Sequence, residues 1–432
     1  MSKTSSPYLS IDKSLKLLLK SITIPNRVEN IPTYQALGRV LKDDVLARTN
    51  TPEYNTSHMD GFAIRSKDVV NASITNPVYL KISEYESILG HIPMHVLPKG
   101  NACRIQTGSN LPLGSDVIVP IEDTKIIDNE KIQIDKPLKA GNFVYLTGSD
   151  IKKGSKMMDK QQLIRAQHIG LLATLQISKV SVYTKPIVSI IPTGNELTDN
   201  IEESKSQDSQ KIINTNSHVL SCLISELGGI PMDFGITPDD PLILKRKIKK
   251  ALNSSDLLLT TGGTSAGKYD VVKSTIEHMG DPGLIARRVK LDRGRVAGIA
   301  SLNQKPIIIL PGPIQGALNA FFVFATPLIS LFSGKNNIEQ FSLDATLTDD
   351  WTGRKKFHDF TKILYIRLSY SKSKETLFAK PITGETQSVS MISESNAFVI
   401  IPETVTELFE GDEVKANLLP GFSYISDIVL LE

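Results

Sequence analysis

The residues best suited to chemistry lie in loops that directly follow short apolar, β-branched segments. The first such loop is residues 192–197, where Glu196 comes after the run Ile190-Ile191. A carboxylate at the exit of a buried strand can bind a metal ion or a polar ligand. Many strand exits carry a glutamate without such a role, so this loop by itself leaves both interpretations open.

A second loop, residues 261–270, is rich in glycine and precedes a helical pattern. Glycine leaves backbone N–H groups accessible, and at the start of a helix these groups bind phosphate. The loop does not match the Walker pattern, because no Gly-Lys-Ser/Thr closes it. Asp270 ends the loop, where it can either cap the helix or, together with Glu196, hold Mg²⁺ against phosphate.

Two further loops occupy equivalent places. Residues 310–316 follow a buried-type strand and open a helix, and residues 237–241 place Asp239 and Asp240 before another helix. Helix capping accounts equally well for those two carboxylates. Ligands of parallel sheets bind outside the carboxyl ends of the strands, so we expect these loops to form one crevice. The residues alone predict a site for a phosphate-bearing ligand and Mg²⁺.

Other kinds of site find little support. His91 and His95 are separated by Pro93, and the remaining histidines are scattered, which argues against a zinc site. The two cysteines, Cys103 and Cys222, are too few for a disulfide framework and indicate a reducing compartment.

The charge balance and the apolar runs bear on partners and location. A formal charge of +3, from 49 basic and 46 acidic residues, is too balanced for a protein that wraps nucleic acid. The N-terminus has no apolar signal segment, and the run 317–332 is shorter than the roughly 20 residues of a spanning helix. We expect a cytoplasmic protein with no nucleic-acid or membrane partner, and a buried helix at 317–332.

A composition of 40% hydrophobic and 22% charged residues over 432 residues predicts a folded chain of several domains. Residues 200–210 are polar and predict a flexible excursion. Helical spacing predicts helices at 15–22, 33–40, 160–175 and 217–227. Short apolar runs predict strands at 78–82, 131–134, 180–183, 187–191, 256–261, 305–310, 357–368 and 398–401.

These elements predict a multidomain α/β protein. Strands and helices alternate in residues 180–333, which should form a central domain with a mostly parallel α/β sheet. A β-rich N-terminal module is expected at 49–139, and a helical linker domain at 1–48 and 140–179. A small C-terminal β-barrel, with a sandwich as the alternative, should form residues 334–432.

Several motifs resemble, in order along the chain, those of the molybdopterin molybdenumtransferase family, which also includes the C-terminal domain of gephyrin. The similarity extends from about Asn26 to the end of the chain. In the N-terminal half the motifs are Ser57-His58-Met59-Asp60-Gly61-Phe62-Ala63, Gln106-Thr107-Gly108-Ser109, Glu122-Asp123 and Gly148-Ser149-Asp150-Ile151. Beyond them are Thr193-Gly194-Asn195-Glu196-Leu197, residues 214–216, Asp239-Asp240 and the loop from Gly262 to Asp270.

The resemblance implies a Mg²⁺-dependent enzyme that inserts molybdate or tungstate into adenylated molybdopterin and releases AMP. It also implies a homodimer, in which the second subunit contributes Asp60 and Thr107, and a molybdopterin adenylyltransferase that supplies the substrate. The residues implied to bind phosphate are Gly262, Gly263, Ser265 and Gly267. Those implied to position metal and nucleophile are Glu196, Asp240 and Asp270, with Glu196 and Asp270 as metal ligands.

Two loops depart from the family pattern. Asp292-Arg293-Gly294-Arg295-Val296 stands where the family has Lys-Pro-Gly-Lys-Pro, and residues 310–316 read Leu-Pro-Gly-Pro-Ile-Gln-Gly instead of Leu-Pro-Gly-Asn-Pro-Val-Ser. Arg293 and Arg295 can replace the lysine charge and bind an oxyanion in bidentate fashion, with Pro311 and Gly312 completing the cofactor site. The departures leave the choice between molybdate and tungstate open.

Two alternatives to the transferase remain. The altered loops are also compatible with a non-catalytic paralogue that binds the cofactor or acts as a scaffold. Another nucleotide-processing enzyme on a related α/β domain, such as an adenylyltransferase, is the third hypothesis. The blocks around Asp60 and Thr107 argue against it, because that domain occurs without the β-rich module.

Overall fold

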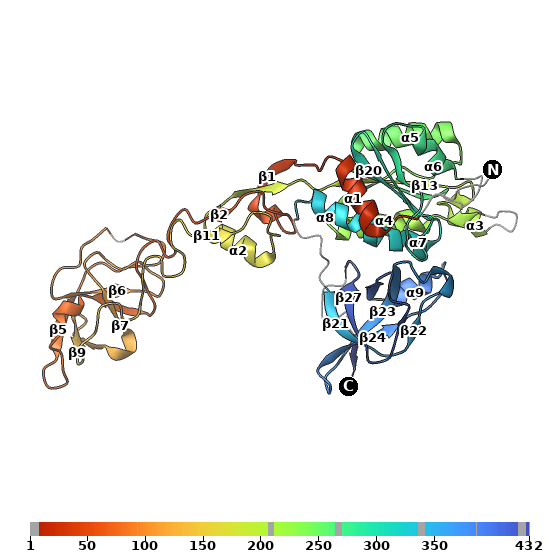
Figure 1. Cartoon of the computed structure of the whole chain (residues 1–432). Helices are drawn as coiled ribbons and strands as arrows, with labels where there is room; N and C mark the ends of the chain where they lie inside the picture. The colour runs from red at the N-terminus through yellow and green to blue at the C-terminus, as the bar shows by residue number, and fades with distance from the viewer. Residues whose placement is uncertain are drawn as a thin grey trace, which may run out of the picture. The chain divides into compact units, whose positions relative to one another are not determined.

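The computed structural model describes residues 8–92, 94–205, 211–263, 270–335, 342–385, 387–421 and 429–431. The chain folds as two compact units. The smaller unit comprises Ile31–Leu37 and Asp43–Val180, and the larger one comprises the chain up to Asn30, Gly38–Lys42 and everything from Ser181 onward. Two of the boundaries between the units fall within β1 (Val28–Pro32) and β12 (Lys179–Tyr183). Figure 1 shows the elements of both units.

The smaller unit is built on a six-stranded sheet of order β7-β4-β6-β5-β9-β8. Its strands are β4 (Gly61–Ile64), β5 (Val78–Ile82), β6 (Asn101–Ile105), β7 (Val117–Pro120), β8 (Lys125–Ile127) and β9 (Lys131–Ile134). Phe62, Leu80 and Ile132 are among the buried residues of its core. The predicted strands at 78–82 and 131–134 are confirmed, because alternating apolar side chains there cover one face of the sheet.

Shorter elements complete this unit. They are η1 (Thr33–Gln35), β2 (Val45–Leu46), β3 (Thr56–Ser57), η2 (Ser66–Asp68), η3 (Ile121–Asp123), β10 (Val144–Tyr145), β11 (Lys156–Met158) and α2 (Ala166–Thr174). Strand β3 pairs with β10 and β2 pairs with β11, all antiparallel.

Two helix predictions in this region are wrong in extent. The helix predicted from residue 160 begins at Ala166, because Gln161 adopts a φ of 66°, which a right-handed helix cannot contain. The helix predicted from Thr33 is a single 3₁₀ turn, and Gly38 soon follows with a φ of 75°. Apolar spacing alone therefore placed the segments but did not detect these breaks.

The larger unit contains a six-stranded sheet of order β16-β13-β17-β20-β19-β18. Strands β16, β13, β17 and β20 are parallel, and β19 and β18 continue the sheet antiparallel. The bounds are β13 (Ile187–Thr193), β16 (Ile230–Asp233), β17 (Leu257–Gly262), β18 (Gly283–Ala286), β19 (Gly298–Leu302) and β20 (Lys305–Leu310). The mostly parallel sheet predicted for this part of the chain is confirmed.

Helices cover both faces of this sheet (Figure 1). On one face α5 (Pro241–Ser254) and α6 (Val271–Glu277) pack against Leu258 and Ile309. On the other face α1 (Ile11–Ser21), α4 (Thr215–Glu226) and α7 (Ile314–Ala320) pack against Val188 and Ile308. Both faces of the strands are therefore buried, which explains their nearly continuous apolar sequences.

The apolar run predicted as a buried helix is confirmed. Helix α7 continues through a π-helical turn (Phe321–Ala325) into α8 (Thr326–Phe332). The stretch Ile314–Phe332 is long and apolar enough to cross a membrane by length and composition, but 83% of it is buried inside the protein. It forms the central helix of the larger unit's core.

A closed five-stranded barrel forms the C-terminal part, in which β24 pairs with both β21 and β23. Its strands are β21 (Ser342–Leu347), β23 (Lys362–Ser371), β24 (Thr376–Pro381), β25 (Ala397–Ile401) and β27 (Glu413–Leu418). Around it lie β22 (Trp351–Thr352), η5 (Lys355–Phe357), α9 (Val389–Glu394), β26 (Glu407–Leu408) and β28 (Val429–Leu431). The predicted barrel is confirmed.

Two boundaries in the larger unit differ from prediction. The strand expected from residue 357 begins at Lys362, because Phe357 ends a 3₁₀ turn and is buried beside Phe360. In the predicted excursion at 200–210, the described residues form the short helix α3 (Ile201–Lys205), which follows β14 (Leu197–Thr198). Asn200 accepts hydrogen bonds from the first backbone N–H groups of that helix, which explains its start.

Candidate active site

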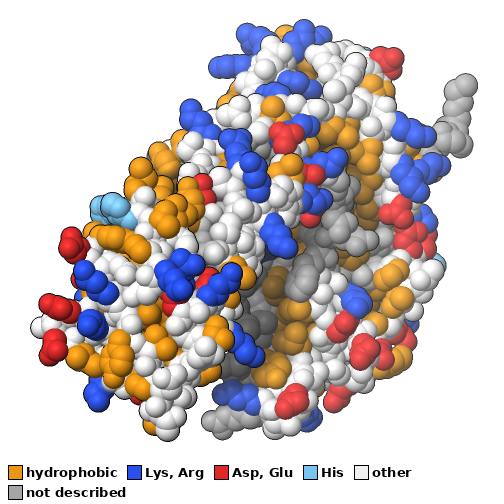
Figure 2. Space-filling model, turned by 90° about the vertical axis from the view of Figure 1, so that its left-hand side faces the viewer, with side chains coloured by type: hydrophobic (Ala, Val, Ile, Leu, Met, Phe, Trp, Pro, Cys, Tyr) orange, Lys and Arg blue, Asp and Glu red, His pale blue; other side chains and the backbone are white. Residues whose placement is uncertain are grey.

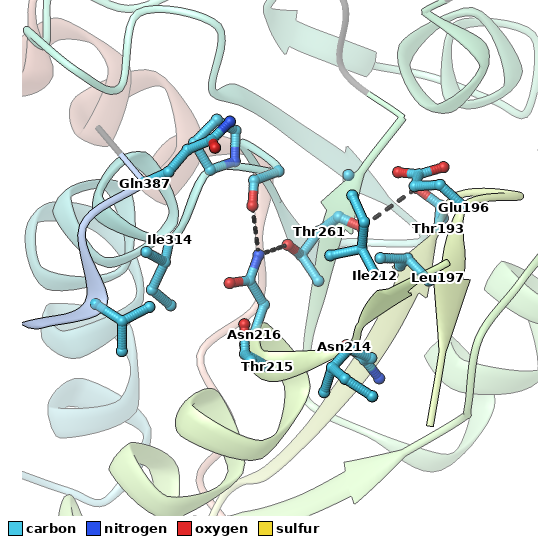
Figure 3. Close-up of a pocket in the computed structure, with 15 residues that line it drawn as sticks. Thr193, Glu196, Leu197, Ile212, Asn214, Thr215, Asn216, Thr261, Ile314 and Gln387 are labelled. Carbon is cyan, nitrogen blue, oxygen red and sulfur yellow. Dashed lines mark hydrogen bonds between the residues drawn. The ribbon is translucent and has the colours of Figure 1, made fainter. Parts of the chain in front are cut away.

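The loops singled out from the sequence meet at one edge of the larger unit's sheet. Thr193 ends β13 opposite Gly262 of β17, and Thr261 lies opposite Leu310 of β20. A cavity of about 470 Å³ opens at this carboxyl edge. Its lining, drawn in Figure 3, is Thr193, Glu196, Leu197, Ile212, Ile213, Asn214, Thr215, Asn216, Thr261, Gly262, Gly312, Pro313, Ile314, Gln387 and Val389.

Backbone geometry at the end of β17 requires glycine. Gly262 and Gly263 have φ values of 86° and 60°. A Cβ on Gly262 would lie 2.2 Å from the Thr193 carbonyl oxygen, and one on Gly263 would lie 2.7 Å from Thr193 Oγ1. The chain therefore passes against β13 with no space for side chains, and at Gly262 it lines the cavity with backbone alone. Ser265 and Gly267, expected to continue this loop, lie outside the described residues.

Asn216, in the first turn of α4, connects the other walls of the cavity. Its Nδ2 donates to Thr261 Oγ1 at 2.7 Å and to the Gly312 carbonyl at 2.8 Å (Figure 3). Its Oδ1 is buried and has no hydrogen-bond partner among the residues that the structure describes. A buried acceptor without a hydrogen bond costs free energy. This oxygen is therefore suited to accept a hydrogen bond from a ligand or from a water molecule.

Glu196 projects from the turn between β13 and β14 and is exposed at the mouth of the cavity. The turn is tight, because a Cβ on Gly194 would lie 2.5 Å from the Glu196 carboxylate. Asn195, the next residue after Gly194, accepts a hydrogen bond from the Asp239 backbone N–H at 3.3 Å. The loop carrying Asp239 and Asp240 is thus adjacent to the turn that carries Glu196.

Asp240 and Asp270 act as helix caps. Asp240 accepts hydrogen bonds from the backbone N–H groups of Leu242 and Ile243 at the start of α5. Asp270 accepts from the backbone N–H of Lys273 at the start of α6, at 3.1 Å. Among the residues that the structure describes, neither carboxylate lines the cavity, whereas Glu196 does. Both carboxylates therefore cap helices, as one of the two interpretations of the sequence had it.

The carboxylates near this edge suit a lightly coordinated Mg²⁺ ion. The described parts of the chain contain no cluster of three or more histidine, cysteine, aspartate or glutamate residues able to hold a metal. Mg²⁺ commonly keeps several waters and uses one or two carboxylates plus the substrate's phosphates. Glu196, which lines the cavity, fits that donor set. Asp270 already faces the buried ammonium of Lys273, with 3.2 Å between Oδ2 and Nζ.

Arg293 lies at a second cavity, of about 220 Å³, between the α/β sheet domain and the barrel. One of its guanidinium nitrogens donates to Gln315 Oε1 at 2.6 Å and also to the Gly384 carbonyl. Burial lowers the pKa of Arg293. Arg295 instead stacks over the Phe357 ring, with 4.9 Å from its guanidinium carbon to the ring centroid. Neither arginine lines the first cavity, of which Gly312 forms part while Pro311 adjoins it.

A polar pair lies in the smaller unit, where the sequence pointed to Asp60 and Thr107. Asp60 Oδ1 accepts hydrogen bonds from the Thr107 backbone N–H at 2.6 Å and from Thr107 Oγ1 at 2.8 Å. The backbone hydrogen bond, followed by the hydroxyl, lowers the pKa of the exposed Asp60 carboxyl. The structure therefore brings together two predicted residues that are far apart in sequence.

Known proteins resemble the chain over nearly its whole length. Three family models match it: the MoeA N-terminal region (domain I and II) at residues 9–175, a probable molybdopterin binding domain at 189–330, and the MoeA C-terminal region (domain IV) at 344–419. A molybdopterin biosynthesis protein of Methanocaldococcus jannaschii is 30% identical over 91% of this chain and 92% of its own length. The chain belongs to the molybdopterin molybdenumtransferase (MoeA) family.

Relatives and solved structures of this family agree on sequence and fold. A molybdopterin molybdenumtransferase of Nostoc is 31% identical over 71% of this chain and 70% of that protein. The crystal structure of the molybdopterin biosynthesis MoeA protein from Pyrococcus horikoshii has a TM-score of 0.84 and 29% identity. It covers 96% of this chain and 100% of that chain. The MoeA family resemblance read from the motifs is thus confirmed.

Some residues of this MoeA-family site escaped sequence reasoning. Asn216 was quoted only as part of a motif, and the signal for its role was an amide in the first turn of a helix. Gln387, which reaches the cavity from the barrel, carries no local signal, because only the tertiary fold brings it there (Figure 3). Lys273 was likewise missed, although it stands one helical turn after Asp270 in the sequence.

Proposed function

We propose that the chain is a molybdopterin molybdenumtransferase, which inserts molybdate or tungstate into adenylated molybdopterin and releases AMP. The observation that carries the proposal is the glycine-walled cavity at the carboxyl edge of the sheet, within a chain of the MoeA family. Its volume of about 470 Å³ suits a small organic ligand. A relative named molybdopterin molybdenumtransferase supports molybdopterin as the substrate.

The cavity offers groups for each part of such a ligand. The backbone at Gly262 and Gly263 approaches a phosphate without side-chain interference. Asn216 Oδ1 is an acceptor for a ring N–H or a hydroxyl group of the ligand. Ile212 and Ile314 provide apolar contact for a flat ring. Ser265 and Gly267 remain proposed phosphate contacts by resemblance alone.

Glu196 is proposed as the residue that holds Mg²⁺ against the ligand's phosphates, with Asp270 as its second protein ligand. Bound there, Mg²⁺ would neutralise charge on the phosphoanhydride. Asp240 is proposed to keep the loop beside Glu196 in place through its helix cap. Glu196 and Asp240 lie in adjacent turns. Together they can orient the nucleophile that attacks the phosphoanhydride.

The oxyanion is proposed to bind on the side where the arginine loop, residues 292–296, faces the barrel. Arg293 there keeps donors in a fork suited to an oxyanion, while Arg295 stacks on Phe357. The first cavity, in contrast, has no lysine or arginine among its described lining residues. Gly312, which follows Pro311, lines the first cavity, and Gln315 lines the second.

A homodimer and a supplying enzyme complete the proposal. The Asp60–Thr107 pair is exposed on the smaller unit and is held in one conformation by two hydrogen bonds. We assign it to the active site of a second copy of the chain. A molybdopterin adenylyltransferase is the proposed source of the adenylated substrate, and the cytoplasm is the proposed site of action.

The test is AMP release from adenylated molybdopterin by the purified full-length protein with Mg²⁺. Three parallel reactions contain molybdate, tungstate or neither. Release that depends on an oxyanion is the expected result, and the more effective anion identifies the metal inserted. Tight binding of the substrate without release in any reaction would contradict the proposal and favour the non-catalytic paralogue.

A further inference from the structure

Lys273 is a buried charge that the proposed chemistry does not use. It lies in the first turn of α6 with only 2% of its surface exposed. Burying an ammonium group costs desolvation energy, and an apolar side chain of similar volume usually gives equal or better stability. A cation is also disfavoured at the positive end of a helix. Stability therefore does not account for a lysine at this position.

The ammonium group has two partners from different loops. Its Nζ donates to the Val296 carbonyl at 2.6 Å and lies 3.2 Å from Asp270 Oδ2. Asp270 ends the glycine-rich loop, and Val296 ends the arginine loop of residues 292–296. One buried charge thus connects the two loops that the proposed function assigns to phosphate and to the oxyanion.

Asp270 is held by Lys273 at both carboxylate oxygens. Oδ1 accepts the Lys273 backbone N–H at 3.1 Å, and Oδ2 faces Nζ. With both oxygens engaged by one residue, rotation of the carboxylate requires breaking two contacts. The backbone also accommodates the lysine, because a Cβ on Gly298 would lie 3.0 Å from Lys273 Cε.

We propose that Lys273 is a positioning residue that fixes the Asp270 carboxylate and the arginine loop relative to each other through its ammonium group. Its catalytic consequence rests on the proposed transferase function, whereas its effect on the arginine loop does not. Lys273 itself touches no substrate in this account. It acts by keeping the Asp270 carboxylate and the arginine loop at a fixed distance from each other. A displacement of a catalytic group by about 1 Å costs roughly 100-fold in rate.

The catalytic part is tested with Lys273→Met, Asp270→Asn, the double variant and Lys273→Arg. Lys273→Met should lower the rate of AMP release roughly 100-fold. The double variant should be slower than Asp270→Asn alone by much less than the loss caused by Lys273→Met, because most of the effect of Lys273 on catalysis acts through Asp270. Lys273→Arg, which keeps a donating cation, should recover part of the loss. Losses that multiply in the double variant, or full activity of Lys273→Met, would overturn the proposal.

A second measurement is independent of activity. Amide hydrogen exchange of residues 292–298 should be faster in Lys273→Met and in the double variant, since Val296 loses its donor in both. The double variant removes both charges and so leaves no unpaired buried ion, which keeps the fold available for comparison. Lys305→Met is the matched control. Lys305 lies at the start of β20, away from the site, and its ammonium donates to the carbonyls of Leu252 and Ser255.

The two measurements separate the proposals. A wild-type protein that releases no AMP would refute the transferase function, and faster exchange in Lys273→Met would still support the positioning role. Unchanged amide exchange at 292–298 in both Lys273→Met and the double variant would refute the positioning role, whatever the activity. Equally fast exchange there in Lys305→Met would refute it too, because the effect would then be a general consequence of losing a lysine.

Discussion

The two cavities of the larger unit differ in how they present polarity. The first is lined by backbone, hydroxyl and amide groups and by one carboxylate, Glu196. The lining of the second includes several charged side chains, most of which already have partners in the protein. Arg354, for example, pairs with Asp292, and Lys362 donates to two backbone carbonyls. On the face drawn in Figure 2, basic and acidic side chains are likewise both scattered over the surface.

This difference shows two ways of preparing a site for an anion. The first cavity depends on close backbone approach, which only glycine permits, and in the proposed function its positive charge comes from a bound metal ion. The second depends on cationic side chains whose charge is partly neutralised by neighbouring groups. A single charge substitution can therefore raise or lower its affinity for an anion. Substitutions should therefore have steep effects in the first cavity and graded effects in the second.

The largest effect is expected for Gly262→Ala. The new Cβ would meet the Thr193 carbonyl at 2.2 Å and would be held at a φ of 86°, so β13 and β17 must separate. We expect AMP release to fall at least 100-fold, by roughly 3 kcal/mol in the barrier. Stability should fall by about 1–3 kcal/mol, measured by urea unfolding.

Gly228→Ala is the matched control for that prediction. Gly228 has a φ of 89°, so it carries similar backbone strain, but a Cβ there meets nothing within 4 Å. It should lose stability without losing AMP release. If AMP release fell equally in both variants, the close approach of Gly262 to Thr193 would not be the cause.

Glu196→Ala should have the next largest effect. Removing the carboxylate from the mouth of the first cavity should reduce AMP release roughly 100-fold, about 3 kcal/mol, and raise the Mg²⁺ concentration needed for half-maximal rate. Stability should be unchanged, because Glu196 is exposed. Glu202→Ala, on the exposed helix α3, serves as the control. A normal Mg²⁺ dependence in Glu196→Ala would remove this residue from the metal site.

A smaller and opposite effect is expected for Asp292→Asn in the second cavity. Asp292 forms a bidentate pair with Arg354, and its loss makes the cavity more positive. The KM for the oxyanion should fall about fivefold, equivalent to about 1 kcal/mol. Stability should fall by about 1 kcal/mol, because Arg354 is 40% exposed and the pair is partly screened. A raised KM would place the oxyanion elsewhere.

The smallest effect concerns Asp60 in the other unit. Its folded pKa lies below the usual value because of Thr107, so its contribution to stability is present above the unfolded pKa. That contribution is lost as pH falls through the folded pKa. Thr107→Val keeps the backbone hydrogen bond but removes the hydroxyl, and should raise the pKa of Asp60 towards its usual value. NMR titration of ¹³C-labelled aspartate carboxyls measures the pKa of Asp60. An unchanged pKa would assign the whole shift to the hydrogen bond from the Thr107 backbone N–H.

Strands and their ends were predictable because apolar runs such as Val78–Ile82 and Lys305–Leu310 extend to the residues where the chain turns. Gly262 and Glu196 were found for the same reason, since they stand at the strand exits. The start of α2 was missed because a left-handed residue, Gln161, interrupts an otherwise helical pattern.

Long-range contacts set the remaining parts of the site. Arg293 was expected to bind the ligand of the loops around Gly262, but its φ of 50° and its hydrogen bond to Gln315 direct it to the second cavity. Gln387, from the barrel, lines the first cavity, and Lys273 donates a hydrogen bond to the distant Val296 carbonyl. Such placements depend on packing between distant segments, which periodicity and local motifs do not contain.

The most direct test of the central claim is a crystal structure of the full chain with adenylated molybdopterin and Mg²⁺. The ligand is expected in the cavity at the ends of β13, β17 and β20, with its phosphates against the backbone of Gly262 and its metal at Glu196. Density for the ligand in the second cavity alone, or on the barrel, would contradict the assignment of the glycine-walled cavity as the substrate site.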